Sequence, residues 1–226
     1  VGAAVQRVID GKSFDFGTVC SSEQTVVAEH GLREKILAEF AARGAHLMND
    51  QERTAVERTL FAGSTTVRAE CVGQSPQKIA QLAGFSITSK IRILASEIQG
   101  VGKEHPLSAE KLSPVLALLF VDSFEAGLQA CEAILRFGGL GHTAVIHAGD
   151  EARVREFGLR MPAFRVLVNT SSPQGSVGIT TSVQPSMTLG CGAIAGNITS
   201  DNVGPQHLIN IKRVAWAVRK PEEAMQ

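Results

Sequence analysis

The chain has 226 residues, of which 44% are hydrophobic and 19% are charged, and its 22 basic residues balance its 22 acidic residues. This composition is typical of a folded protein with one substantial core, and the neutral charge gives no general attraction to nucleic acid or to an anionic membrane. Aromatic residues are sparse, which argues against base stacking, and no apolar run approaches the roughly 20 residues that a membrane span needs.

Two further features concern the compartment. The N-terminal residues show no basic region followed by an apolar region, so we expect no signal peptide. The four cysteines, Cys20, Cys71, Cys131 and Cys191, are tens of residues apart and have no zinc-site spacing, so no metal site is predicted. We expect free thiols in a reducing cytosol.

The first half of the chain alternates between helical and strand-like apolar spacing. Helices are predicted from residue 3 to about Gly11, over 32–40 with Gly44 near the C-cap, from Asn49 or Asp50 to about Phe61, and from Ser75-Pro76 to Gly84. The segment QTVVA, residues 24–28, is predicted to be a strand.

The second half continues this alternation. Strands are predicted over 90–97, 115–121, 142–148 and 165–169, and a helix over 124–137. Several of these strands are continuous apolar runs, which indicates strands covered on both faces. The predicted fold class is therefore α/β, with a mainly parallel open sheet flanked by helices. Residues 170–206 are rich in small and polar residues and are predicted to form a long loop that approaches a ligand or another segment.

Cys20 lies in the turn GTVCSSEQ, directly before a predicted strand. Such a turn can present a side chain to a cleft and surround it with backbone N–H groups, which would lower the pKa of the thiol and stabilise a developing oxyanion. The alternative from residue type alone is a buried or idle cysteine.

Five segments strengthen the catalytic interpretation of Cys20. They are FDFGTVCSSEQ, EKLSPVLAL, FGGLGHTAVIH, RVLVNTSSPQG and PSMTLGCGAIAGNITSDNVGPQHLINIK, in this order. Together they resemble the catalytic domain of CoA-acylating aldehyde dehydrogenases of the acetaldehyde dehydrogenase type, which also occurs in the N-terminal half of bifunctional aldehyde-alcohol dehydrogenases. The resemblance extends from the Cys20 segment to about Arg219.

This resemblance implies a mechanism. The Cys20 thiolate would attack a small aldehyde, hydride would pass to NAD, and the resulting thioester would be transferred to coenzyme A to give an acyl-CoA. Glu110 matches the position of a glutamate that binds the ribose hydroxyls of the nicotinamide, although alone it would be interpreted as a solvated residue beside Lys111. Leu112 stands where the superfamily often has an aromatic residue behind the nicotinamide.

The resemblance also assigns two further positions. His142 matches a histidine on the substrate and CoA side, which would protonate a leaving thiolate or orient the thioester. A histidine at a strand start, bonded to local backbone, is the alternative. Cys191 lies in a loop typical of the family, and its neighbours are loop formers, so we expect a packing role. Cys131 is expected in the core, and Cys71 has no assignment.

The expected domain organisation is a catalytic domain over 1–206 and a tail over 207–226. Family members are about twice as long, so the dinucleotide-binding domain is expected to be missing from this chain, which alone should show little or no dehydrogenase turnover. The tail has a strand-like pattern and is expected to join a neighbouring subunit in a homodimer or higher oligomer. The parent enzyme is expected in the cytoplasm, free or inside a bacterial microcompartment.

Other functions stay open at this point. A hydrolytic aldehyde dehydrogenase or a phosphate-ester semialdehyde reductase would share the fold. A non-catalytic assembly domain would keep the fold and leave Cys20 no more reactive than ordinary thiols. A cysteine hydrolase would need Cys20 and His142 within hydrogen-bond reach of each other.

Overall fold

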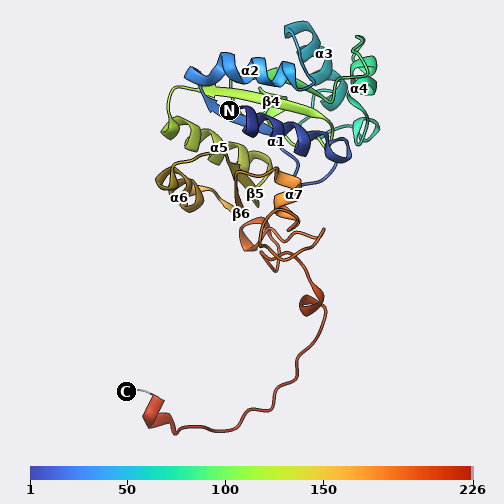
Figure 1. The fold of residues 1–226 in the computed structure, drawn as a ribbon. Helices are drawn as coiled ribbons and strands as arrows, with labels where there is room; N and C mark the ends of the chain where they lie inside the picture. The colour runs from blue at the N-terminus through green and yellow to red at the C-terminus, as the bar shows by residue number, and fades with distance from the viewer. Residues whose placement is uncertain (225–226) are drawn as a thin grey trace.

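The computed structural model describes residues 1–224 and has an α/β fold with two parallel sheets (Figure 1). The first sheet has four strands in the order β1-β4-β3-β2, and the second pairs β5 with β6. The strands are β1 Thr25–Glu29, β2 Ala45–Leu47, β3 Ile93–Glu97, β4 Val115–Val121, β5 Gly141–Ile146 and β6 Ala163–Val168. All four strand pairings are parallel, which confirms the predicted fold class.

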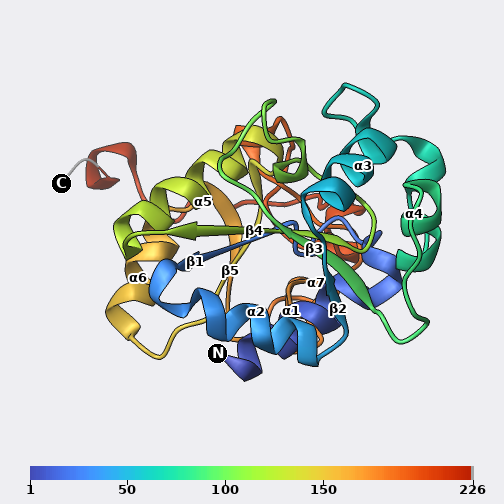
Figure 2. The ribbon, with the colours of Figure 1, turned by 90° about the horizontal axis from the view of Figure 1, so that it is seen from above.

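Seven α-helices surround these strands. They are α1 Gly2–Ser13, α2 Arg33–Ala42, α3 Asp50–Phe61, α4 Pro76–Leu82, α5 Phe124–Gly138, α6 Glu151–Arg160 and α7 Ser172–Ser176, counted over residues 1–224. Figure 2 shows α3 and α4 at one side of the four-stranded sheet and α6 at the other. The predicted helices over 3–11, 32–40, 49–61, 75–83 and 124–137 are all present. Helices α6 and α7 and strand β2 were not predicted.

The four-stranded sheet is covered on both faces, which explains the continuous apolar run of β4. Leu116 and Leu118 pack with residues of α1 and α2, whereas Val115, Ala117 and Leu119 pack with residues of α3 and α4. All five side chains are 7% exposed or less. Strand β4 therefore lies at the centre of the core, with side chains in both clusters. Full burial of one such aliphatic side chain stabilises the folded chain by about 1.5–3 kcal/mol.

Helix α5 connects the two sheets. Its residues Leu128 and Leu135 pack with Ala144 and Ile146 of β5 and with Phe157 of α6 in a separate cluster. The opposite face of α5 packs toward the core of the first sheet through Ala130 and Phe137. Helix α5 thus packs against β1 of the first sheet and against β5 of the second.

Local signals define where helices begin. Asn49 caps α3 in a reciprocal arrangement, since its side chain accepts from the backbone N–H of Glu52 and the Glu52 carboxylate accepts from the N–H of Asn49. The Ser75 hydroxyl accepts from the N–H of Lys78 at the start of α4, with Pro76 in the first turn. Both starts agree with the prediction.

The chain leaves the globular part after residue 207 and runs outward without helix or strand until Lys220 (Figure 1). Among residues 208–224 no strand forms where the sequence has a strand-like pattern, because this single chain offers the segment no neighbouring strand. Within residues 1–224, none of the helices combines the length and the apolar character that crossing a membrane requires.

Candidate active site

The turn before Cys20 has an unusual backbone. Asp15, Phe16 and Gly17 have φ angles of 47°, 49° and 72°, so three successive residues adopt the left-handed conformation. A Cβ atom at Gly17 would lie 2.5 Å from the carbonyl oxygen of Ser113, so only glycine fits there. This close approach packs the Cys20 turn against the segment that follows Glu110. Cys20 itself is exposed, as the sequence predicts for a presented side chain.

The thiol of Cys20 is not activated by its surroundings. Partial burial raises its pKa, and the negative charges of Glu110 and Cys191 raise it further, whereas the backbone N–H groups of Cys20 and Ser21 lower it. The net direction is upward. The backbone N–H groups lower the thiol pKa, as expected of such a turn, but burial and the two neighbouring negative charges outweigh them.

One cavity of about 450 Å³ brings several predicted residues together. Cys20, Glu110 and His142 all line it, and so do Gly138 and Gly139 at the end of α5. The remainder of the cavity extends between β1 and β5 and is lined mainly by aliphatic side chains of α1, β1, α5 and β5. Leu112 does not line this cavity. It lies in the turn beyond Glu110 with a φ angle of 41°.

Glu110 is itself exposed, but it lies close to two buried lysines that sequence reasoning missed. Partial burial raises the pKa of Glu110, while Lys12 and Lys111 lower it. Both lysines are fully buried. The Lys111 ammonium donates to the carbonyl oxygens of Leu107 and Ala109, at 2.5 and 2.8 Å. Glu110 is thus exposed, as the alternative of a solvated glutamate expects, but its neighbour Lys111 is fully buried.

The side-chain oxygen of Gln24 joins the two lysines. It accepts from the Lys12 ammonium at 3.4 Å and from the backbone N–H of Lys111 at 3.1 Å. Burial lowers the pKa of Lys12 to about 7, although Glu23 and Glu110 act in the opposite direction. Two buried lysine side chains thus lie behind the wall that carries Cys20 and Glu110, and no local sequence pattern marks them.

Glu23 is a partly exposed acidic residue whose charge acts on Lys12. Its pKa is raised to about 7 by burial, against the lowering effects of Ser172, its own backbone N–H and Lys12. One carboxylate oxygen accepts from the backbone N–H of Ser172 at 2.7 Å, and the other has no hydrogen-bond partner among the described residues. Glu23 therefore attaches the loop after Cys20 to the start of α7.

His142 lies at the start of β5. Its Nδ1 atom is 2.8 Å from the hydroxyl of Thr143, and its backbone N–H donates to the carbonyl of Gly139. Burial, and secondarily the charge of Arg165, lower the pKa of His142 to about 4, so the ring is neutral at pH 7. Within residues 1–224, no hydrogen bond joins His142 to Cys20, so the pairing that a cysteine hydrolase needs is not formed.

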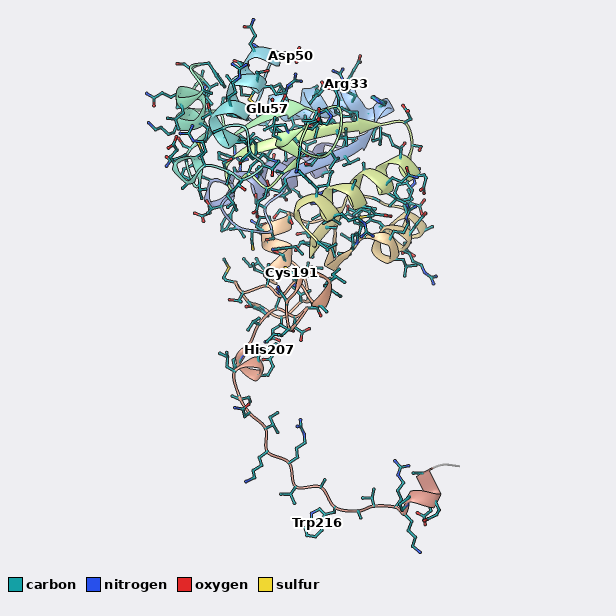
Figure 3. All side chains as sticks on the ribbon, turned by 180° about the vertical axis from the view of Figure 1, so that it is seen from behind. Arg33, Asp50, Glu57, Cys191, His207 and Trp216 are labelled. Carbon is teal, nitrogen blue, oxygen red and sulfur yellow. The ribbon has the colours of Figure 1, made fainter. Side chains whose placement is uncertain are left out.

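The other three cysteines differ in their environment. Cys71 is fully buried in the core, and Cys131 on α5 is half-buried against the apolar part of the cavity, where burial raises its pKa to about 12. Cys191 lies at the base of the globular part, in the loop below the sheets (Figure 3). Cys191 is close enough to Cys20 for its charge to raise the Cys20 pKa. From the sequence we expect only a packing role for Cys191, and its position near Cys20 was not predicted.

Comparisons with known proteins agree with the resemblance found in the sequence. The bifunctional aldehyde-alcohol dehydrogenase AdhE of Escherichia coli K12 is 40% identical over 217 residues, which cover 94% of this chain and 24% of that enzyme. The crystal structure of an acetylating aldehyde dehydrogenase from Geobacillus thermoglucosidasius has 44% identity and a TM-score of 0.94, covering 97% of this chain and 48% of that one. The crystal structure of a probable aldehyde dehydrogenase from Listeria monocytogenes has 40% identity and a TM-score of 0.94. The match covers 99% of this chain and 49% of that one.

These matches confirm that the chain is homologous to a region of the acetylating aldehyde dehydrogenases. The chain spans about a quarter of AdhE and about half of the two solved structures. No family model matches it.

Proposed function

We propose that this chain, homologous to a region of the acetylating aldehyde dehydrogenases, carries the acyl group of a CoA-acylating aldehyde dehydrogenase on the thiol of Cys20. The observation that supports this most strongly is the shared cavity of Cys20, Glu110 and His142, in a chain that is similar to such enzymes over 94% of its length. An exposed thiol suits this role, because sulfur is a strong nucleophile as thiolate and its thioesters pass readily to another thiol.

In the proposed reaction, the sulfur of Cys20 forms a bond to the carbonyl carbon of a small aldehyde. The backbone N–H groups of Cys20 and Ser21 lower the pKa of this thiol, and we propose that they also donate to the aldehyde oxygen as it becomes negative. Loss of hydride from the same carbon leaves a thioester on Cys20. The sulfur of a second thiol then bonds to the thioester carbon, and the bond from that carbon to Cys20 breaks. The acyl group leaves on the second sulfur, and the Cys20 thiolate takes up the proton of the attacking thiol.

A nicotinamide cofactor, which we propose to be NAD, supplies the hydride acceptor when it is bound. The chain offers one residue suited to hold it. Glu110 lines the cavity with a carboxylate that can accept hydrogen bonds from ribose hydroxyls. Leu112 lies outside the cavity lining, and we propose no contact for it. Coenzyme A is the proposed acyl acceptor. We propose that His142 faces the part of the cavity where coenzyme A binds.

The organisation of the chain is part of the proposal. Residues 1–206 form the region that carries substrate and thioester, and residues 207–226 form a tail for assembly. The four cysteines form no disulfide, which is compatible with a cytoplasmic enzyme. We propose that the dinucleotide is bound mainly by another part of the parent protein, and that this chain alone has little dehydrogenase turnover. NADH production by the purified chain would contradict that statement.

Acyl transfer between Cys20 and coenzyme A can be tested on this chain without a nicotinamide cofactor. The chain is incubated with acetyl-CoA and analysed by mass spectrometry after digestion at acidic pH, which preserves thioesters. We expect one acetyl group on the Cys20 peptide, released again by free coenzyme A. Cys20→Ser should abolish this labelling, and Cys191→Ser should retain it. Labelling of Cys191 in place of Cys20 would overturn the assignment.

A further inference from the structure

An arginine lies inside the second sheet, in the otherwise apolar segment RVLV. Arg165 of β6 is 4% exposed and is directly opposite Thr143 of β5 in the strand register. Its guanidinium donates to the carbonyl oxygen of Gly190 at 2.7 Å, to that of Ser200 at 3.1 Å and to the Thr143 hydroxyl at 3.4 Å. Within residues 1–224, no carboxylate pairs with it. A buried charge is costly unless hydrogen bonds compensate it, and here neutral oxygens do so together with the nearby side chain of Cys191.

The hydroxyl of Thr143 lies between Arg165 and His142. A guanidinium can only donate, so the hydroxyl oxygen accepts from Arg165. A threonine hydroxyl has a single hydrogen, and the only other hydrogen-bonding atom recorded beside it in the described chain is Nδ1 of His142, at 2.8 Å. The hydroxyl therefore donates its hydrogen to Nδ1.

The opposite arrangement is less favourable. If Nδ1 of His142 carried the ring proton, the Thr143 oxygen would accept from both neighbours, and its own hydrogen would have no acceptor among the described residues. A polar hydrogen left unpaired in a half-buried position costs stability. The neutral ring then carries its proton on Nε2, and the low pKa of His142 agrees with a ring that is uncharged at pH 7.

The Nε2 atom of His142 has no protein partner in residues 1–224, and it is not among the atoms sealed from solvent without a partner. His142 lines the same cavity as Cys20. We propose that Arg165 and Thr143 are positioning residues that hold His142 as the neutral Nε2–H tautomer, so that the ring donates a hydrogen bond into the cavity. The receiving group rests on the proposed function: it is the acyl oxygen of the Cys20 thioester. His142 then acts as a hydrogen-bond donor and not as a base.

The tautomer can be measured directly by ¹⁵N NMR of the histidine rings at pH 7, with His142 assigned by its loss in His142→Gln. We expect the Nε2–H pattern in the native chain. Thr143→Val keeps the shape of the side chain and removes the hydroxyl, so the Nδ1–H form should become populated. Thr143→Ser should restore the native pattern. An Nδ1–H pattern in the native chain, or an unchanged pattern in Thr143→Val, would overturn the proposal.

This measurement needs no turnover, so it separates the positioning proposal from the proposed function. A second measurement tests the consequence for acyl transfer, with the rate of Cys20 deacylation by coenzyme A as its readout. A glutamine amide can approach the place of Nε2, whereas an asparagine amide mimics Nδ1, so His142→Gln should retain more activity than His142→Asn. Since a single oxyanion donor contributes about 10²–10³ in rate, we expect about 10²-fold loss in His142→Asn. Equal rates in both variants would contradict a donor at Nε2.

Discussion

Gly141 lies directly against Cys191. A Cβ atom at Gly141 would overlap the carbonyl oxygen of Cys191, and the φ angle of Gly141 is 77°. This contact holds the loop that contains Cys191 at the start of β5, next to His142. A glycine is required for two reasons here, since both the backbone conformation and the close approach exclude a side chain.

Gly141→Ala should therefore destabilise the chain by about 3 kcal/mol, because left-handed strain and overlap with backbone atoms add. Urea unfolding measures the change. Gly196→Ala is the matched control, because Gly196 has a φ angle of 75° but no atom within 4 Å of a Cβ position. The control should lose only about 1 kcal/mol, the cost of the conformation alone. Equal losses in both variants would show that the Cys191 contact is unimportant.

Glu23 should make stability depend on pH. Its pKa is raised from 4.5 to about 7 in the folded chain, so between these values the folded state binds a proton that the unfolded state has lost. The stability that Glu23 contributes is fully present below pH 4.5, its pKa in the unfolded chain. It is lost as the pH rises toward 7, its pKa in the folded chain. We expect a loss of about 2 kcal/mol from this residue between pH 5 and pH 7. Glu23→Gln should remove that slope in urea unfolding.

Lys12 should make the stability rise with pH, the opposite of Glu23, and should do so at higher pH. Folding lowers its pKa from 10.5 to about 7. The stability that Lys12 contributes is therefore fully present above pH 10.5 and is lost as the pH falls toward 7. The variant Lys12→Met should reduce the slope of the stability profile above pH 7, and part of that slope should remain because burial also lowers the pKa of Lys111. A flat profile in the native chain from pH 5 to pH 10 would contradict both assignments.

The reactivity of Cys20 should be limited by Glu110. The negative charge of Glu110 raises the Cys20 pKa, so Glu110→Gln should lower that pKa and speed alkylation by iodoacetamide at pH 8 by about threefold to tenfold. Site-specific mass spectrometry gives the rate, and the buried Cys71 serves as an unreactive internal reference. A slower reaction in Glu110→Gln would show that the carboxylate activates the thiol instead.

The tail should mediate association. Ile211, Val214, Trp216 and Val218 are all more than 60% exposed, and Trp216, the only tryptophan, lies far out on the extended segment (Figure 3). Such a row of apolar side chains is typical of a segment that binds a partner, which we propose to be a second copy. Light scattering should show a dimer or larger assembly, with blue-shifted Trp216 emission at high concentration.

Deletion of residues 211–226 provides the control for this prediction. The shortened chain should be monomeric by light scattering. A strict monomer before and after the deletion would argue against assembly through the tail.

Much of the fold is predictable from the sequence because its strands and helices have clear apolar periods. The run VLALLFV indicates a strand covered on both faces, and the structure has it at the centre of the sheet. Strand β2 has three residues, which is too short for a period, and α6 buries only Phe157, so neither has a strong pattern. The division into two sheets depends on tertiary packing around α5, which no local pattern encodes.

The site is only partly predictable. Cys20, Glu110 and His142 were selected from motifs, and the structure brings them to one cavity. The buried lysines were missed because lysine is almost always solvated, and their burial depends on carbonyl oxygens that only the folded chain supplies. Arg165 did have a signal, namely a charge within an apolar strand, which marks a buried residue that needs partners.

The central claim is that the sulfur of Cys20 carries an acyl group between two thiols. Its most direct test is acyl exchange, in which the chain is mixed with acetyl-CoA and dephospho-coenzyme A and the appearance of acetyl-dephospho-CoA is followed by chromatography. The account predicts exchange that is catalytic in the chain, is lost in Cys20→Ser and persists in Cys191→Ser. Exchange that continues at the native rate in Cys20→Ser would contradict it.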